Sequence, residues 1–274
     1  MSKRYTIATR AIELISRNGR PLFCAYCGTE TPSIGGSGMC ANCELPLSAS
    51  MDAVRASKPT QFSYASQISS KTSAGDYDGA SKLCDAAYSD TKDSGYMYTK
   101  GIIYTKWSND EAARISYDRS GFMEENTVHR SKATGFAAQA RAAFAYVISQ
   151  AAHSDSSTSA DPYLIFLCQL KLHNLREAAE ELKIIKKSGK PMQEAYAMMM
   201  LELNTGNPEA ALKASDLLLK PDLFSINALY YVAEALADKK DYNTSRKLAL
   251  ELMGKLPKAK LKSLIWRIDK ASTI

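Results

Sequence analysis

The chain has 274 residues, of which 45% are hydrophobic and 23% charged, and 35 Lys and Arg against 29 Asp and Glu give it a formal net charge of +6. This composition excludes a wholly disordered protein, because it leaves enough apolar side chains for one large domain or two modest ones. A membrane-spanning segment is also excluded, since no window approaches the roughly 18 to 20 uncharged apolar residues that a spanning helix needs. The first residues contain no apolar secretory core, so a cytoplasmic location is expected, where the six Cys would not form disulfides.

Basic residues are concentrated at the two ends of the chain. Residues 1–23 hold five Lys and Arg against one Glu, and residues 254–274 hold six against one Asp, so the body between them is slightly acidic. Clustered basic side chains attract phosphates and acidic protein surfaces over about 10 Å at moderate salt. Two interpretations stay open: solvated termini, or contacts with nucleic acid from Arg4, Arg10, Arg17 and Arg20.

Two Cys pairs follow the basic segment, Cys24-Ala-Tyr-Cys27 and Cys40-Ala-Asn-Cys43, with twelve residues between them. Each C-x2-C turn lets two thiolates converge on one ion, and two such turns complete a tetrahedral shell without a position for water. The spacing therefore predicts one structural zinc ion. The segment resembles a zinc ribbon, and we assign residues 1–48 to a basic N-terminal helix followed by this ribbon.

Other uses of the cysteines are less consistent with the pattern. A single C-x2-C can be a thioredoxin-like redox pair, but two pairs at this spacing without a βαβ pattern favour a metal. Iron of the rubredoxin type shares the four-thiolate ligand set and stays open as an alternative to zinc. Cys84 and Cys168 lie alone in apolar helical patterns and are predicted to be small buried side chains.

From about residue 60 the sequence predicts helical hairpins with an internal repeat. In five segments, such as Gly206-Asn-Pro-Glu-Ala-Ala211, a Gly, His, Ser or Lys begins a turn and a small residue follows five positions later. The turn closes one helix and caps the next, and the small residue lets two antiparallel helices approach closely. The small residues are separated by 33, 65, 33 and 34 positions, where 65 is close to two periods: Ala80, Ala113, Ala178, Ala211 and Ser245.

A period near 34 with this hairpin pattern resembles the tetratricopeptide repeat. The resemblance implies a mainly α fold, an α-solenoid of tetratricopeptide-like hairpins over residues 60–256, with residues 257–274 as a basic capping helix. The repeats are degenerate, because most of the family's Trp, Leu and Gly in the first helix are replaced and only Gly101 retains that Gly. The period expected at 128–158 is replaced over 128–152 by one long helix or a nearly fused pair, followed by a polar loop at 153–159.

The resemblance also implies a partner-binding groove lined by the first helices of the hairpins. Fifteen positions before the small residue, at the family's groove-facing position, four of the five repeats carry Tyr, and these are Tyr98, Tyr163, Tyr196 and Tyr230. Tyr gives rigid, amphipathic contact area that suits an extended peptide or a partner helix. The alternative is that these rings only pack between repeats.

No enzyme motif accompanies these features. The three His lack a partner at ligand or triad spacing, and the phosphate-binding and nucleophile-elbow glycine motifs are missing. We therefore expect a non-enzymatic adaptor that binds a partner protein or peptide, with no small-molecule substrate and no membrane contact. The second hypothesis is an RNA- or ribosome-associated factor that uses the basic ends and the ribbon.

Overall fold

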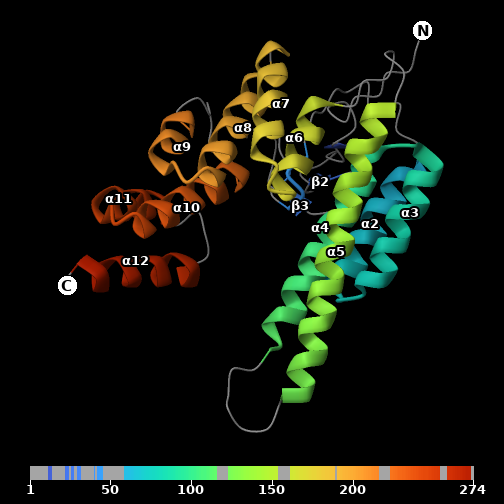
Figure 1. The fold of residues 1–274 in the computed structure, drawn as a ribbon, viewed down its shortest axis with the longest axis horizontal. Helices are drawn as coiled ribbons and strands as arrows, with labels where there is room; N and C mark the ends of the chain where they lie inside the picture. The colour runs from blue at the N-terminus through green and yellow to red at the C-terminus, as the bar shows by residue number, and fades with distance from the viewer. Residues whose placement is uncertain are drawn as a thin grey trace.

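The computed structural model describes residues 12–13, 22–24, 26–27, 30–31, 40, 42–45, 59–115, 123–153, 161–188, 190–215, 223–253 and 258–272. This part of the chain is mainly helical, and each helix packs on the next along the sequence (Figure 1). The helices are α2 (Pro59–Ser73), α3 (Tyr77–Thr91), α4 (Ser94–Ala113), α5 (Met123–His153), α6 (Pro162–Lys171), α7 (Leu175–Lys187), α8 (Pro191–Asn204), α9 (Pro208–Ser215), α10 (Leu223–Asp238), α11 (Tyr242–Glu251) and α12 (Lys258–Ser272). No described helix is long and apolar enough to cross a membrane.

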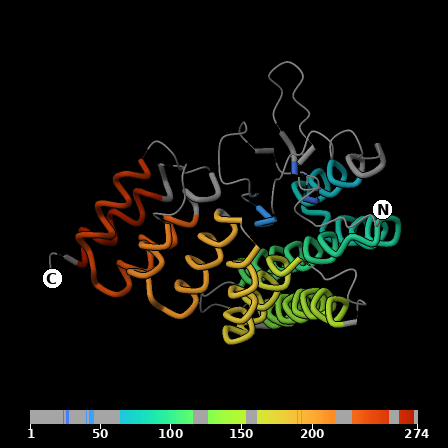
Figure 2. The backbone as a smooth tube through the Cα atoms, turned by 90° about the horizontal axis from the view of Figure 1, so that it is seen from above, coloured from blue at the N-terminus to red at the C-terminus, as the bar shows by residue number. Residues whose placement is uncertain are grey.

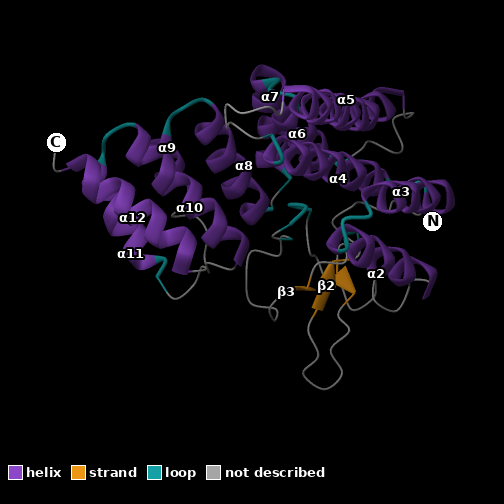
Figure 3. Ribbon diagram, turned by 90° about the horizontal axis from the view of Figure 1, so that it is seen from below, coloured by secondary structure: helices purple, strands orange, loops and turns teal. Residues whose placement is uncertain are grey.

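Three short antiparallel strands lie on one side of helices α4 and α5 (Figure 3). They are β1 (Ile12–Glu13), β2 (Leu22–Cys24) and β3 (Glu30–Thr31), with β2 in the middle. The helix predicted for the N-terminal basic segment is therefore wrong at Ile12 and Glu13, which pair with Cys24 and Phe23. Their backbone N–H and C=O groups are paired with β2 and not within a helix, and the local sequence pattern gives no information on this pairing.

Four of the helix-to-helix turns share one backbone geometry. Each contains a residue with a left-handed φ between 60° and 77°, and the next N–H donates to the carbonyl five residues earlier at 2.8 or 2.9 Å. This is the Schellman pattern, which satisfies the last carbonyls of one helix as the chain reverses into the next. The left-handed residues are Gly75, His173, Gly206 and Lys240.

A small side chain is fully buried five positions after each of these turns. Ala80, Ala178, Ala211 and Ser245 have no exposed surface. Ser245 also donates a hydrogen bond from Oγ to the carbonyl of Ala233 at 2.6 Å, which ties α11 to α10. All four small residues are thus buried where the two helices of a hairpin pack together, as the predicted close approach requires.

The predicted turn at 108–113 is wrong. Helix α4 runs without a break from Ser94 to Ala113, and Ala113 is exposed. The reason is the pairing of α4 with α5: Ser108 donates from Oγ to the carbonyl of Ala133 at 2.8 Å, and Trp107 stacks on Phe136 with centroids 3.7 Å apart. These contacts favour a continued helix over a turn.

Helix α5 is a single helix of 31 residues, which settles the open question over 128–152. It packs along α4, and Gly101 of α4 makes the close approach possible, since an added Cβ would stand 2.4 Å from Cε1 of Phe144. The two long helices extend beyond the others (Figure 1). The polar loop predicted at 153–159 lies outside the described residues beyond His153.

Helix α12 ends the row of helices (Figure 2) and packs on α11. Its inner face buries Leu261, Leu264 and Ile268, and Ile265 packs beside them partly buried. Two ion pairs also hold this helix to its neighbours: Arg246 Nε lies 2.9 Å from an oxygen of Asp269, and Arg267 lies 3.5 Å from an oxygen of Asp238.

Candidate metal centre

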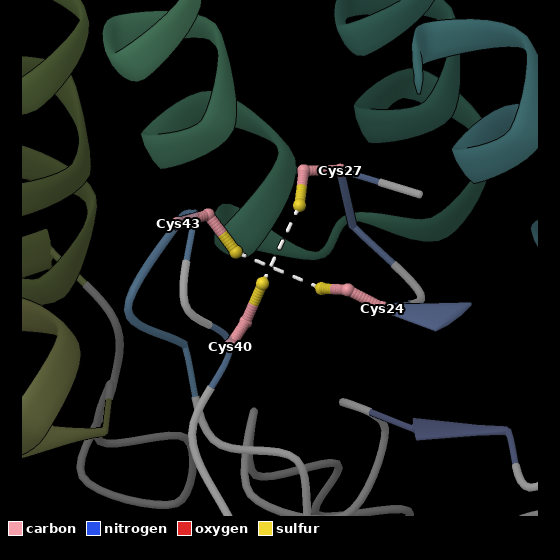
Figure 4. A group of neighbouring side chains, drawn as sticks. All are labelled: Cys24, Cys27, Cys40 and Cys43. Atoms are coloured by element: carbon pink, nitrogen blue, oxygen red, sulfur yellow. Dashed lines mark hydrogen bonds between the residues drawn. The ribbon is translucent and has the colours of Figure 1, made fainter. Parts of the chain in front are cut away.

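The two C-x2-C turns bring four thiols to one point, as the spacing predicts (Figure 4). The Sγ atoms of Cys24 and Cys43 lie 3.6 Å apart, as do those of Cys27 and Cys40, and all four lie within 4.8 Å of one another. A disulfide is excluded within these pairs, because its S–S bond is about 2.05 Å. Four sulfurs at about 2.3 Å from a central ion would be separated by about 3.8 Å, so the set fits a tetrahedral ion.

Burial makes a cation necessary if these thiols ionise. All four Cys are buried, and burial raises the pKa of Cys24 and Cys43 well above the usual thiol value. Hydrogen bonds from the neighbouring thiols lower the pKa of Cys27 well below it. Clustered thiolates without a compensating charge would repel one another in a medium that solvates them poorly. A divalent ion that binds four sulfurs removes both penalties.

The backbone of the second turn is closed by two hydrogen bonds. The N–H of Cys40 donates to the carbonyl of Leu45, and the N–H of Glu44 donates to the carbonyl of Cys40, both at 2.9 Å. Glu44 has a left-handed φ of 62°. A side chain in this region costs roughly 1 kcal/mol or more, so Gly would be the default choice there. Gly28 follows the first pair in the same way in the sequence and lies outside the described residues.

The first turn packs against the N-terminus of α4. Tyr26 is buried, and its hydroxyl donates to Oδ2 of Asp93 at 3.1 Å, while Oδ1 of Asp93 caps the helix by accepting from the N–H of Gly95 at 3.0 Å. Residue 95 must be Gly here, because a Cβ added to it would stand only 2.4 Å from Cε1 of the Tyr26 ring. The ring also meets Tyr96 edge to face, with centroids 5.3 Å apart. Tyr26 therefore packs on the helices and is not an exposed contact for nucleic acid.

The second turn is held by α4 and α6 through Glu44. Tyr98 donates its hydroxyl to Oε2 of Glu44 at 3.2 Å, and Nζ of Lys171 lies 3.0 Å from the same oxygen. Tyr163 donates to the carbonyl oxygen of Glu44 at 3.3 Å. Burial, and next the charge of Glu44, raise the pKa of Tyr98 and Tyr163 well above 10, so both hydroxyls stay protonated and donate. The metal turns therefore belong to the same core as the helices.

This arrangement corrects the predicted partner surface. Tyr98 and Tyr163 are fully buried and bind the chain's own Glu44, so they do not present an open face to a partner. Tyr196 and Tyr230 are also buried, and Tyr230 donates to Oε1 of Glu234 at 2.8 Å. The alternative that these rings pack between helices is therefore the one observed.

The two isolated Cys are buried as predicted, whereas the four predicted Arg contacts lie outside the described residues. Cys84 and Cys168 are buried, and burial raises the pKa of each thiol well above the usual value, as expected for core side chains. The proposed nucleic-acid contacts lie outside the described residues: Arg4, Arg10, Arg17 and Arg20.

One polar pair was not predicted from the sequence. Nδ1 of His129 on α5 lies 2.7 Å from Oε2 of Glu111 on α4, and Nη1 of Arg114 lies 3.0 Å from the other oxygen of this buried carboxylate. His129 is eighteen positions from Glu111, which no helical or motif spacing indicates. Arg114 pairs with the charge of Glu111, and His129 contacts the other carboxylate oxygen from the neighbouring long helix, so a structural role explains the cluster.

No protein-family model, no curated protein and no solved structure matches the chain.

Proposed function

We propose that the protein is a non-enzymatic interaction scaffold, a solenoid of tetratricopeptide-like hairpins with a structural zinc ion bound by Cys24, Cys27, Cys40 and Cys43. The observation that carries the proposal is the turn geometry repeated at Gly75, His173, Gly206 and Lys240, each followed by a fully buried small residue. Repeated hairpins of this kind form extended surfaces that other proteins use to bind partners. Contacts of α4 with α6, α6 with α8 and α8 with α10 support a stack of first helices.

Structural zinc is supported by the ligand set and by its surroundings. Four thiols complete a tetrahedral shell, and a shell without an open position has no place for a substrate or a reactive water. Elemental analysis of the purified protein should find one zinc per chain. Iron in its place would give the colour of a rubredoxin-type centre, and a folded protein without bound metal would contradict the assignment.

The partner surface is proposed on the C-terminal helices, because the Tyr positions nearer the metal site are used internally. Tyr231 of α10 is 50% exposed and Trp266 of α12 is 64% exposed. Aromatic side chains of these two types often carry the binding energy of protein interfaces. A protein partner captured by the tagged chain should resist nuclease and be weakened by Tyr231→Ala or Trp266→Ala. Val128→Ala, at an exposed apolar side chain of α5 outside these helices, serves as control.

The same capture experiment distinguishes a protein partner from the alternative, an RNA partner. If phosphates dominate, retention should disappear with nuclease and fall steeply between about 50 and 200 mM salt. Charge reversal at Arg10, Arg17 and Arg20 should then abolish retention. Capture that is insensitive to nuclease, salt and these charge reversals excludes RNA as the main partner.

A further inference from the structure

Glu44 is the point where the metal-binding turns meet the helical array. Its carboxylate is bound by Tyr98 of α4 and Lys171 of α6, and its carbonyl oxygen is bound by Tyr163 of α6. In sequence these partners are 54, 127 and 119 positions away. A single residue of the turn therefore contacts two helices.

Two of the three partner side chains, Tyr98 and Lys171, bind the Glu44 carboxylate, and the third, Tyr163, binds the backbone carbonyl. Lys171 supplies a positive charge and its side chain is only 29% exposed, so the interaction with Glu44 is partly shielded from water. Tyr98 and Tyr163 supply hydroxyl donors that are fixed by burial. Hydrogen bonds to a charged acceptor are stronger than those between neutral groups.

The position of the Glu44 carboxylate depends on the closed second turn. Glu44 directly follows the ligand Cys43, and its own N–H is bonded to the carbonyl of the ligand Cys40. Its left-handed φ directs the side chain toward α4 and α6 at a conformational cost that a free chain would avoid. An ion that holds Cys40 and Cys43 together keeps Glu44 in this conformation.

We propose that Tyr98 and Lys171 form a carboxylate-binding site for Glu44, with Tyr163 bound to the backbone carbonyl of the same residue, and that this site couples metal binding to the packing of α4 and α6. The inference rests on the proposed four-thiolate metal site. Metal binding places Glu44 for its partners, and the partners in turn stabilise the metal-binding conformation of the turn. Coupling of this kind is reciprocal. If the metal strengthens the binding of Glu44 by Tyr98 and Lys171 by some factor, these contacts must strengthen metal binding by the same factor, although neither side chain touches the metal.

The test is a cobalt titration of the full chain after removal of metal, because Co²⁺ bound by four thiolates absorbs visible light. Tyr98→Phe and Lys171→Met should each lower Co²⁺ affinity by roughly 10- to 100-fold, the range found when groups around metal ligands are removed. The matched controls are Tyr230→Phe, which removes a Tyr hydroxyl bonded to Glu234, and Lys239→Met, which removes an ion pair with Glu209. Both controls should retain the affinity of the unmodified chain.

A second measurement follows the helices instead of the metal. Adding metal should raise the midpoint of thermal unfolding, measured by helical circular dichroism, and the rise should be smaller in Glu44→Gln and in Lys171→Met. The double variant Glu44→Gln with Lys171→Met should lose little more than either single variant, because both remove the same interaction.

The outcomes distinguish the coupling from the metal site itself. Absence of a cobalt–thiolate spectrum in the unmodified chain would overturn the metal site. A normal spectrum with unchanged Co²⁺ affinity in folded Tyr98→Phe and Lys171→Met would leave the metal site standing and overturn the coupling. A variant that does not fold is replaced by Glu44→Gln, which keeps the size of the side chain, removes its charge and exchanges one acceptor oxygen for an amide group.

Discussion

Tyr26 donates a hydrogen bond to Asp93 at 3.1 Å, and Asp93 in turn caps helix α4. The first Cys pair is thereby bound to the start of a helix whose fifth residue, Tyr98, binds the second Cys pair through Glu44. The first five residues of α4 therefore contact both Cys-containing loops of the metal site. A small metal module that lacks enough apolar area to fold alone gains its support from this helix.

Gly95→Ala should destabilise the protein, because the new Cβ would stand 2.4 Å from the Tyr26 ring. The ring must move, which strains its packing and weakens its hydrogen bond to Asp93. We expect a loss of roughly 1 to 3 kcal/mol in the free energy of unfolding. Urea unfolding followed by circular dichroism measures it.

The matched control is Gly135→Ala in α5. Among the described residues, no side chain or remote backbone atom lies within 4 Å of a Cβ added at Gly135. Ala is favoured over Gly in a helix interior by about 1 kcal/mol, so this variant should be as stable as the parent or more stable. Equal effects of the two substitutions would contradict the assigned contact at Gly95.

Cys43→Ser should abolish tight metal binding, whereas Cys168→Ser should leave one metal per chain. Cys43 is one of four converging thiols, and its replacement leaves three sulfurs and a weaker ligand. Cys168 is buried alone in α6 and is not part of that cluster. Metal content after dialysis distinguishes the variants. Loss of metal from both would place Cys168 in the site or show that metal binding fails with general destabilisation.

The sequence predicted those features that depend on local spacing. The Cys pairs encode two tight turns, and residues such as Gly206 and Ala211 encode a turn and a contact five positions apart. The predicted turn at Ser108 was wrong because a long-range contact with α5 decides it, and local pattern carries no information on that contact.

The contacts of Glu44 were also beyond the sequence. A Glu beside a Cys pair reads as an ordinary exposed charge, and its left-handed backbone is not indicated by its residue type. Its partner Lys171 lies 127 positions away. The Tyr positions were found from the repeat period, but Tyr98 and Tyr163 contact Glu44, which lies outside the repeat and which the period does not indicate.

Stability should fall in alkaline solution, in part through Tyr77. Burial, and next a hydrogen bond donated to Asp110, raise the pKa of Tyr77 from 10.0 to about 12. A group with a raised pKa in the folded state contributes stability that is complete below the unfolded pKa, and this contribution is lost as pH rises from about 10 to about 12. Urea midpoints across this interval should fall less in Tyr77→Phe than in the parent. The exposed Tyr231→Phe is the control, and an equal fall in both variants would contradict the role of Tyr77.

Ala211→Leu tests the repeated hairpin contact on which the proposed scaffold depends. Ala211 is fully buried five residues after the turn at Gly206, where α9 packs on α8. Three added carbon atoms have no space there, so the helices must separate, at an expected cost of roughly 1 to 3 kcal/mol. Ala178→Leu should behave alike, since it has the same position in the α6–α7 hairpin, whereas Ala142→Leu on the exposed face of α5 should be nearly neutral. Unfolding midpoints of the three variants decide the matter: if the buried substitutions are as mild as the exposed one, the small residues do not set the spacing of the hairpins.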